Sequence, residues 1–110
     1  MNLTRGDVHW IDLPDRDPKG AEIEKRRPCV ILSLTGVNAH RKTLVVVPLT
    51  TKQKEAPPIL ISVPSGGVDS KAVCDQILAV DKKRVLGKAG SLSQKDMKLL
   101  EESVSRVLGL

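Results

Sequence analysis

Short apolar runs alternate with polar connections along most of this chain. The runs are rich in β-branched residues, which favours strands over helices. Five strand-like runs cover residues 6–13, 28–34, 43–49, 59–63 and 71–80, the last broken near Asp75. Clusters of Gly, Pro, Asn, Asp and Ser predict turns or loops between them, at residues 14–26, 36–42, 51–58 and 65–69. This order favours a small antiparallel barrel or a sandwich, and the pattern alone does not choose between them.

The last part of the chain predicts a helix. Apolar side chains recur there at helical spacing and form one face for burial, namely Met97, Leu100, Val104, Val107 and Leu108. The Ser93 hydroxyl suits an N-cap, and Asp96 in the first turn complements the helix dipole. Gly109 is placed to end the helix. A shorter turn or helical piece is expected at residues 81–86.

The length of 110 residues predicts one domain, spanning residues 1–110. A chain of this size buries only a small core, so a dimer interface would help to stabilise it. No apolar run approaches the roughly 20 residues needed to cross a bilayer. The segment Met1–Arg5 lacks the apolar stretch of a signal peptide. We therefore expect a cytoplasmic protein without a membrane partner.

The net charge of +5 and the pI of about 9.5 favour a polyanionic or acidic partner. The basic residues gather in three clusters, at residues 25–27, 40–42 and 82–88. Trp10 is the only aromatic residue, so the chain lacks the stacking platform of general single-strand binders. A nucleic-acid partner would therefore be bound by charge and by polar contacts to base edges.

The cysteines and histidines do not predict a metal site. Cys29 and Cys74 lie inside expected strands, where each reads as a small buried hydrophobe. No pair of cysteines has zinc-ligand spacing, and His9 and His40 are isolated from one another. We expect no metal and no cofactor.

Five segments, in order, resemble the MazF/PemK family of toxin endoribonucleases. They are Arg5-Gly6-Asp7-Val8, Arg27-Pro28 with the apolar run behind it, Val47-Pro48-Leu49-Thr50-Thr51, Asp75-Gln76 with Asp81 following, and the terminal helix ending in Leu108-Gly109-Leu110. Each pattern is weak alone, but their order and spacing agree over nearly the whole chain.

The resemblance implies a mainly β protein with helices, an SH3-like barrel of the CcdB/PemK type with a C-terminal helix, acting as a homodimer. It implies sequence-selective, metal-independent cleavage of single-stranded RNA, leaving a 2′,3′-cyclic phosphate and a 5′-hydroxyl. It also implies a cognate antitoxin whose acidic tail occupies the RNA groove.

The same resemblance assigns Arg27 and Thr50 as the catalytic pair. An arginine fork suits a phosphate that gains charge, and a threonine hydroxyl can donate to a non-bridging oxygen. Arginine stays protonated in water, so Arg27 is not assigned as the base. The residues expected to bind substrate around the pair are Glu22, Lys25, Arg26, Asp75, Gln76, Lys82 and Arg84.

Two departures from the family pattern affect the expected site. The loop at 20–23 reads Gly-Ala-Glu-Ile where the family often has Gly-Ser-Glu-Gln, so Glu22 is kept while two polar side chains are lost. Some members carry a second arginine where this chain has Val73. Lys71 or Arg84 would have to supply a second cation.

Two other functions stay open at this stage. A CcdB-like toxin uses the same barrel to bind DNA gyrase without catalysis, and the apolar end Leu108-Gly109-Leu110 suits such a contact. An inactive homologue would still bind the antitoxin. Neither alternative requires Arg27 or Thr50.

Overall fold

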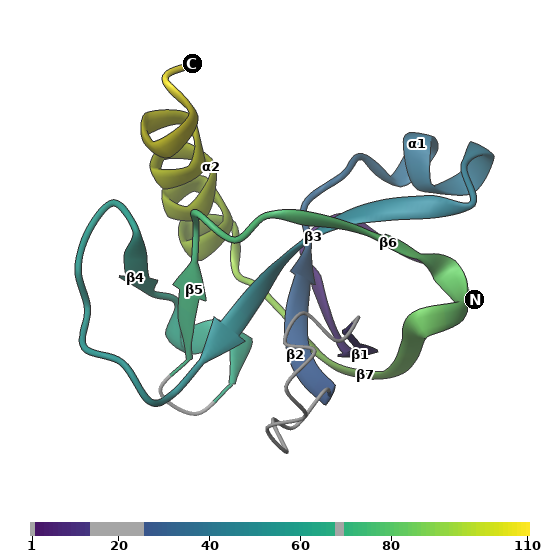
Figure 1. Cartoon of the computed structure of the whole chain (residues 1–110), viewed down its shortest axis with the longest axis horizontal. Coiled ribbons are helices and arrows are strands. Elements are labelled where there is room, and N and C mark those ends of the chain that lie inside the picture. Colours follow the sequence, from purple (N-terminus) through teal and green to yellow (C-terminus); the bar gives the residue numbers. More distant parts are fainter. Residues whose placement is uncertain (1, 14–25, 68–69) are drawn as a thin grey trace, which may run out of the picture.

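The computed structural model describes residues 2–13, 26–67 and 70–110 (Figure 1). These residues contain seven strands, two α-helices and two 3₁₀ turns. The strands are β1 Asp7–Asp12, β2 Arg26–Ile31, β3 Thr43–Thr50, β4 Leu60–Ser62, β5 Lys71–Val73, β6 Leu78–Asp81 and β7 Val85–Ser91. The helices are α1 Thr35–His40 and α2 Gln94–Leu108, and the 3₁₀ turns are η1 Pro64–Gly66 and η2 Lys82–Arg84.

All strand pairs are antiparallel, in the order β4-β5-β3-β2-β1-β7, with β6 pairing with β3. Strand β3 is the centre of the fold, since β2 lies along one edge and β5 and β6 share the other. On the edge that β5 and β6 share, Leu49 of β3 pairs with β5 and Val46 pairs with β6. The strand pairing on this edge is therefore interrupted at Val47 and Pro48. Proline has no N–H to give to a ladder, which fits an interruption there.

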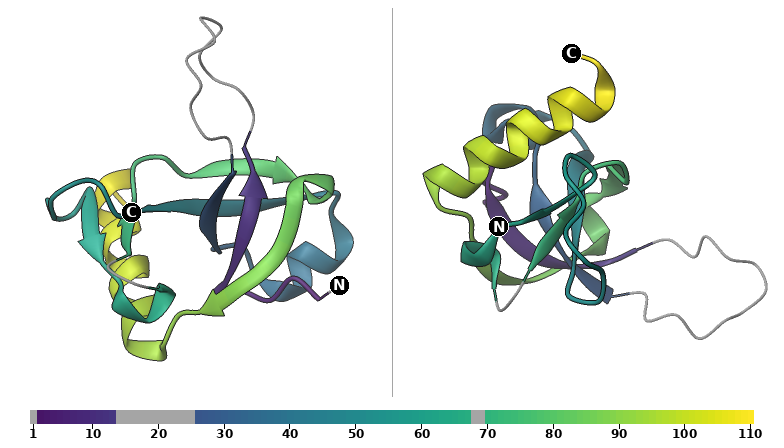
Figure 2. Two further views of the ribbon diagram at one scale, coloured as in Figure 1. Left: turned by 90° about the horizontal axis from the view of Figure 1, so that it is seen from below. Right: turned by 90° about the vertical axis from the view of Figure 1, so that its left-hand side faces the viewer.

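The strongly curved sheet forms a barrel-like wall with α2 across one end (Figures 1 and 2). No pairing between the described parts of β4 and β7 closes it. The predicted mainly β, barrel-like fold with a C-terminal helix is confirmed, in an open form. One continuous sheet also decides against the sandwich.

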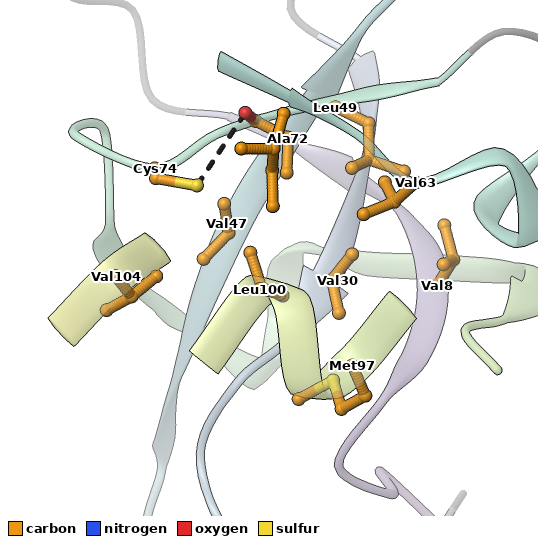
Figure 3. Packing of buried hydrophobic residues seen from close by; sticks show 11 residues of the cluster. Val8, Val30, Val47, Leu49, Val63, Ala72, Cys74, Met97, Leu100 and Val104 are labelled. Carbon is orange, nitrogen blue, oxygen red and sulfur yellow. Dashed lines mark hydrogen bonds between the residues drawn. The ribbon is translucent and has the colours of Figure 1, made fainter. Parts of the chain in front are cut away.

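One hydrophobic core lies between the sheet and α2. Met97, Leu100 and Val104 of the helix face the strands, with Leu100 fully buried (Figure 3). The strands contribute Val8, Val30, Val47, Leu49, Ile61 and Ala72, and the residues directly after β4 and β5 add Val63 and Cys74. The predicted apolar face of the last helix is confirmed for these three residues, and Val107 is partly buried against the same core. Leu108 is 55% exposed, so its predicted burial is wrong: the face ends at Val107.

A second core lies on the other face of β2 and β3. It contains Leu3, Ile11, Cys29, Ile31, Leu44, Val46, Val80 and Val85. Neighbouring residues such as Val30 and Ile31 thus enter different cores, as strand geometry requires. Strands buried on both faces have near-continuous apolar sequences, which explains the unbroken apolar runs in this part of the chain.

Helix α2 begins and ends as predicted. The Ser93 hydroxyl accepts a hydrogen bond from the Asp96 backbone N at 3.1 Å. Gly109 adopts the left-handed conformation, with φ of 73°, and its N–H returns to carbonyls of the last turn. Among the described residues, no helix is long and apolar enough to cross a membrane.

Two local predictions were wrong. The expected turn at 36–42 contains α1, a single short helix fastened by Asn38, whose Nδ2 donates to the carbonyl of Leu3 at 2.9 Å. Strand β7 was not predicted, because Gly87 and Gly90 interrupt any apolar alternation and most of its residues are exposed. Its partner is β1, with irregular register, so β7 depends on backbone pairing and not on its own side chains.

Candidate active site

Arg27 lies near the start of β2, at the end of the second core. It is half-buried and pairs across the sheet with Ile11. Cys29, two residues further along the same face, is fully buried and its Sγ donates to the Arg27 carbonyl at 3.7 Å. Burial raises the pKa of the Cys29 thiol to about 12, and the positive charge of Arg27 acts weakly in the opposite direction.

The strand pattern directs Arg27 and Thr50 to one face of the sheet. Strands β2 and β3 pair through Cys29 with Pro48, Val30 with Val47, and Ile31 with Val46. Arg27 and Thr50 each lie two residues beyond the Cys29–Pro48 pair, on β2 and β3 respectively. Side chains two residues apart on a strand point to the same face, so the two predicted catalytic side chains project from the face that carries Cys29 and Pro48.

The environment of Thr50 leaves its hydroxyl proton available. The side chain is only 8% exposed, at the last position of β3. Its Oγ1 accepts a hydrogen bond from the Lys52 backbone N at 3.3 Å. A hydroxyl that accepts this bond still has one O–H to donate, and a phosphate oxygen would be a suitable acceptor.

Lys71 extends the same row. It pairs directly with Thr50 across β3 and β5, and with Ser62 across β5 and β4. Its side chain is half-buried. The row therefore contains a guanidinium, a hydroxyl and an ammonium on one face, a set of donors suited to an anion such as phosphate. The sequence raised Lys71 only as a substitute cation and missed Ser62, since neither lies in a recognisable motif.

Asp75 and Gln76 lie outside this row. Both are exposed, in the turn that joins β5 to β6, where the Gln76 N–H donates to the Val73 carbonyl at 3.1 Å. This turn runs alongside the interrupted part of β3. Burial raises the pKa of Cys74 to about 11, and the neighbouring charge of Asp75 adds to the effect. Both side chains are therefore free to meet solvent in this turn, and their predicted contact with substrate stays a prediction.

The remaining predicted contact residues are spread along one side. Arg26 is exposed and pairs with Asp12, and Arg84 Nη1 donates to the Asp12 carbonyl at 3.2 Å. Lys82 lies further from the row, where its N–H donates to the Lys42 carbonyl at 2.9 Å. Glu22 and Lys25 lie outside the described residues.

The histidines do not join the row. His9 is 3% exposed, lies opposite Cys29, and has Nδ1 3.2 Å from the Leu86 carbonyl, so Nδ1 carries a proton. Its Nε2 is buried without a hydrogen-bond partner among the described residues. His40 is exposed at the end of α1. Within the described ranges, no group of three or more His, Cys, Asp or Glu side chains is arranged to hold a metal ion.

Comparison with known sequences adds independent evidence. The family model described as PemK-like, MazF-like toxin of type II toxin-antitoxin system matches residues 4–108. Endoribonuclease MazF9 of Mycobacterium tuberculosis is 31% identical over 118 aligned positions, covering 98% of each chain. Endoribonuclease toxin MazF of Escherichia coli is 28% identical and covers 94% of this chain and 92% of its own length.

Solved structures agree in fold. A mycobacterial endoribonuclease in complex with its cognate antitoxin superposes with a TM-score of 0.81 at 25% identity, covering 97% of this chain and 95% of that one. MazF from Deinococcus radiodurans gives a TM-score of 0.82 at 20% identity, with 100% and 99% covered. The sequence resemblance to the MazF/PemK family is confirmed.

Proposed function

Because this chain belongs to the PemK-like, MazF-like family of type II toxins, we propose that it is an endoribonuclease that cleaves single-stranded RNA without a metal. The observation that carries the proposal is the row formed by Arg27, Thr50 and Lys71 on one face of the sheet. Two relatives that align over nearly the full chain are named endoribonucleases, which supports the same activity.

In the proposed reaction, the 2′-oxygen of one nucleotide attacks the adjacent phosphorus. The 2′-oxygen loses its proton as its bond to phosphorus forms. The bond to the 5′-oxygen breaks, and that oxygen takes up a proton. The products are a 2′,3′-cyclic phosphate and a 5′-hydroxyl, and no atom changes its oxidation state.

The row would stabilise the charge that develops on the phosphorane. Arg27 donates two parallel hydrogen bonds to phosphate oxygens, and the Thr50 hydroxyl donates a third. Lys71, directly across from Thr50, supplies the second positive charge. Removing such charge-stabilising donors from enzymes typically lowers kcat by about 10²–10³-fold.

Residues around the row would hold the rest of the strand. Arg26 and Arg84 offer charge beside Arg27, while Asp75 and Gln76 face a neighbouring nucleotide from the β5–β6 turn. Glu22, Lys25 and Lys82 are further substrate contacts in this proposal. The near absence of aromatic side chains makes charge the main source of affinity.

The proposal extends to the protein's partners and location. The solved structure of a mycobacterial endoribonuclease in complex with its cognate antitoxin supports an antitoxin partner for this chain too. We further propose a cytoplasmic homodimer, in which residues 1–110 act as one toxin domain.

The test is a cleavage assay on a long single-stranded RNA in EDTA, with end-group analysis of the fragments. The wild type is compared with Arg27→Ala and with Thr50→Val, which removes the hydroxyl and keeps the side-chain shape. We expect discrete cuts with cyclic-phosphate ends, reduced about 10²–10³-fold in both variants. Thr50→Ser restores the hydroxyl and should recover much of the activity.

Two results would contradict the proposal. A folded, antitoxin-free wild type that cuts no RNA would exclude the nuclease and favour a gyrase-binding or inactive homologue. Equal cutting by wild type and Arg27→Ala would show that the row is not the active site.

A further inference from the structure

Two basic segments far apart in the sequence meet at one end of the molecule. Thr43, at the start of β3, pairs with Asp81, at the end of β6. The next residue, Lys82, donates its N–H to the Lys42 carbonyl at 2.9 Å. The residues after α1 therefore lie against η2, on the same side of the molecule in both Figure 1 and Figure 2 (left). Arg41, Lys42 and Lys83 are exposed there.

The other end of η2 reaches the candidate active site. Arg84 Nη1 donates to the Asp12 carbonyl at 3.2 Å, and Asp12 pairs with Arg26, next to Arg27. A single 3₁₀ turn thus joins the basic residues behind α1 to the arginines at the start of β2. We call this line of residues the η2 track: Arg41, Lys42, Lys82, Lys83, Arg84 and Arg26.

The η2 track is strongly positive. Among the described residues, Asp81 and Asp12 are its acidic neighbours, and the Asp81 carboxylate accepts the Lys83 backbone N–H at 2.8 Å, as the cap of η2. Within the described part of the chain, the ion pairs found are Arg5–Glu101 and Lys88–Asp7, and neither involves the track. The cations of the track are thus not used in ion pairs with described residues.

We infer that Arg41, Lys42 and Lys83 bind the phosphates of the RNA strand at some distance from the cut, and that the η2 track guides this strand from Arg27 to the end of α1. The inference rests on the proposed function and goes beyond it, because the relevant residues lie at the opposite end of β3 from Thr50. Eight residues of strand span at most about 27 Å, a separation that a few extended nucleotides can cross.

An RNA strand fits this surface better than an acidic protein segment. The track reaches the start of β2 at Arg26, the residue before Arg27 in the chain, so one polyanion can extend from the row around the strand end onto the track. Phosphates repeat at every nucleotide, which matches a line of separate cations. Each phosphate that is neutralised on a single strand contributes about 0.7 to the slope of log affinity against log salt.

The experiment measures binding and cleavage in the same protein. The variant Arg41→Ala/Lys42→Ala removes two exposed side chains and leaves the Lys42 carbonyl in place. The matched control Lys95→Ala/Lys98→Ala removes two exposed cations from α2. Binding is measured with 2′-O-methyl RNA, which lacks the attacking hydroxyl, in a short form covering one mapped cut and in forms extended on either side.

The expected result depends on RNA length. For an extended RNA, the Arg41→Ala/Lys42→Ala variant lowers the salt slope by about 1.4 and weakens binding, whereas the α2 control keeps the wild-type values. For the short RNA, the variant and the control behave alike. Circular dichroism melts verify that both variants are folded.

Three results would overturn the inference. One is an equal salt slope for variant and wild type at every RNA length. Another is an equal loss of RNA affinity and salt slope in the α2 control, which would show that only the net charge of the protein matters. The third is unchanged RNA binding with lost binding of a polyglutamate peptide, which would assign the surface to an acidic protein segment. If the wild type cuts no RNA at all, the proposed function fails first, and the two failures are thereby distinguished.

Discussion

At the scale of single residues, Lys71 has the clearest untested role. Its pairing with Thr50 places a positive charge where the phosphorane would form. We expect Lys71→Met, which keeps the length and removes the charge, to lower kcat by about 10–100-fold, or about 1.4–2.7 kcal/mol of transition-state stabilisation. Single-turnover cleavage measures the effect.

Lys71→Arg and Lys95→Met are the controls for this prediction. Arginine keeps the charge and should retain most of the rate, while Lys95 is exposed on α2 and its replacement should change little. If all three variants cut as fast as the wild type, a single cation at Arg27 is sufficient.

Cys29 gives a pH-dependent prediction. In the folded protein burial raises its pKa to about 12, from an ordinary value of 9.0. Between pH 9 and pH 12 the thiol ionises only in the unfolded chain. Ionisation therefore favours the unfolded state, and the free energy of unfolding falls as pH rises above 9. The contribution reaches about 1.4 kcal/mol per pH unit.

Urea unfolding of wild type and Cys29→Ala over this pH range isolates the effect. The difference in free energy of unfolding between wild type and Cys29→Ala should be constant below pH 9. Above pH 9 it should shift in favour of the variant. For Cys74→Ala the same shift should end earlier, because the pKa of Cys74 is raised only to about 11. Parallel curves for wild type and Cys29→Ala would show that the thiol ionises equally in both states.

At the scale of elements, the start of α2 depends on one carboxylate. Asp96 Oδ2 accepts hydrogen bonds from both the backbone N, at 3.0 Å, and the hydroxyl of Ser65, so it ties the helix to η1. The Ser65 hydroxyl also accepts the Ser93 backbone N–H at 2.9 Å. Asp96 is buried and Ser65 is exposed, so Asp96→Ala removes two hydrogen bonds to a charged group and should cost about 1–3 kcal/mol.

Denaturant unfolding checks this value, with Gln94→Ala as the control. Gln94 is exposed in the same turn, and its replacement should stay within about 0.5 kcal/mol of the wild type. A similarly small effect for Asp96→Ala would mean that water replaces the lost carboxylate.

The elements differ in how far sequence alone predicts them. Helix α2 has a cap, an apolar face and a terminal glycine within one short segment; the cap and the glycine are confirmed, and the face is confirmed except at Leu108. Strand β7 has none of these local signals, since its partner β1 is more than 70 residues away in the chain. The Lys71–Thr50 pair is hidden for the same reason: register between distant strands follows from the packing of both cores, not from either segment.

At the scale of the whole molecule, the two hydrophobic cores share the strands β2 and β3. Val30 and Val47 enter one core, while Ile31 and Val46 enter the other. Neither core can therefore melt without disturbing the strands that the other requires. We expect one cooperative unfolding transition, in which Trp10 fluorescence on β1 and the helical signal of α2 change together.

Leu100→Ala tests this coupling. It removes a fully buried side chain from the core under α2 and should cost about 2–5 kcal/mol. The neighbouring Leu99 is 41% exposed, so Leu99→Ala is the matched control. In Leu100→Ala, the unfolding midpoints measured by Trp10 fluorescence and by the helical signal of α2 should fall by the same amount. Early loss of the helical signal with Trp10 unchanged would show that the cores unfold separately.

The place of Thr50 at the end of β3 also bears on which mutations would abolish the toxicity of this protein in the cell that makes it. Strand β3 supplies side chains to both cores before it ends at Thr50, the hydroxyl of the proposed site. Random changes within it remove the folded protein altogether, whereas changes at the half-exposed Arg27 and Lys71 leave an intact but silent product. Cells that survive expression of the toxin would then fall into two classes. Cells with a mutation within β3 would contain no folded protein, and cells with a mutation at Arg27 or Lys71 would contain abundant inactive protein.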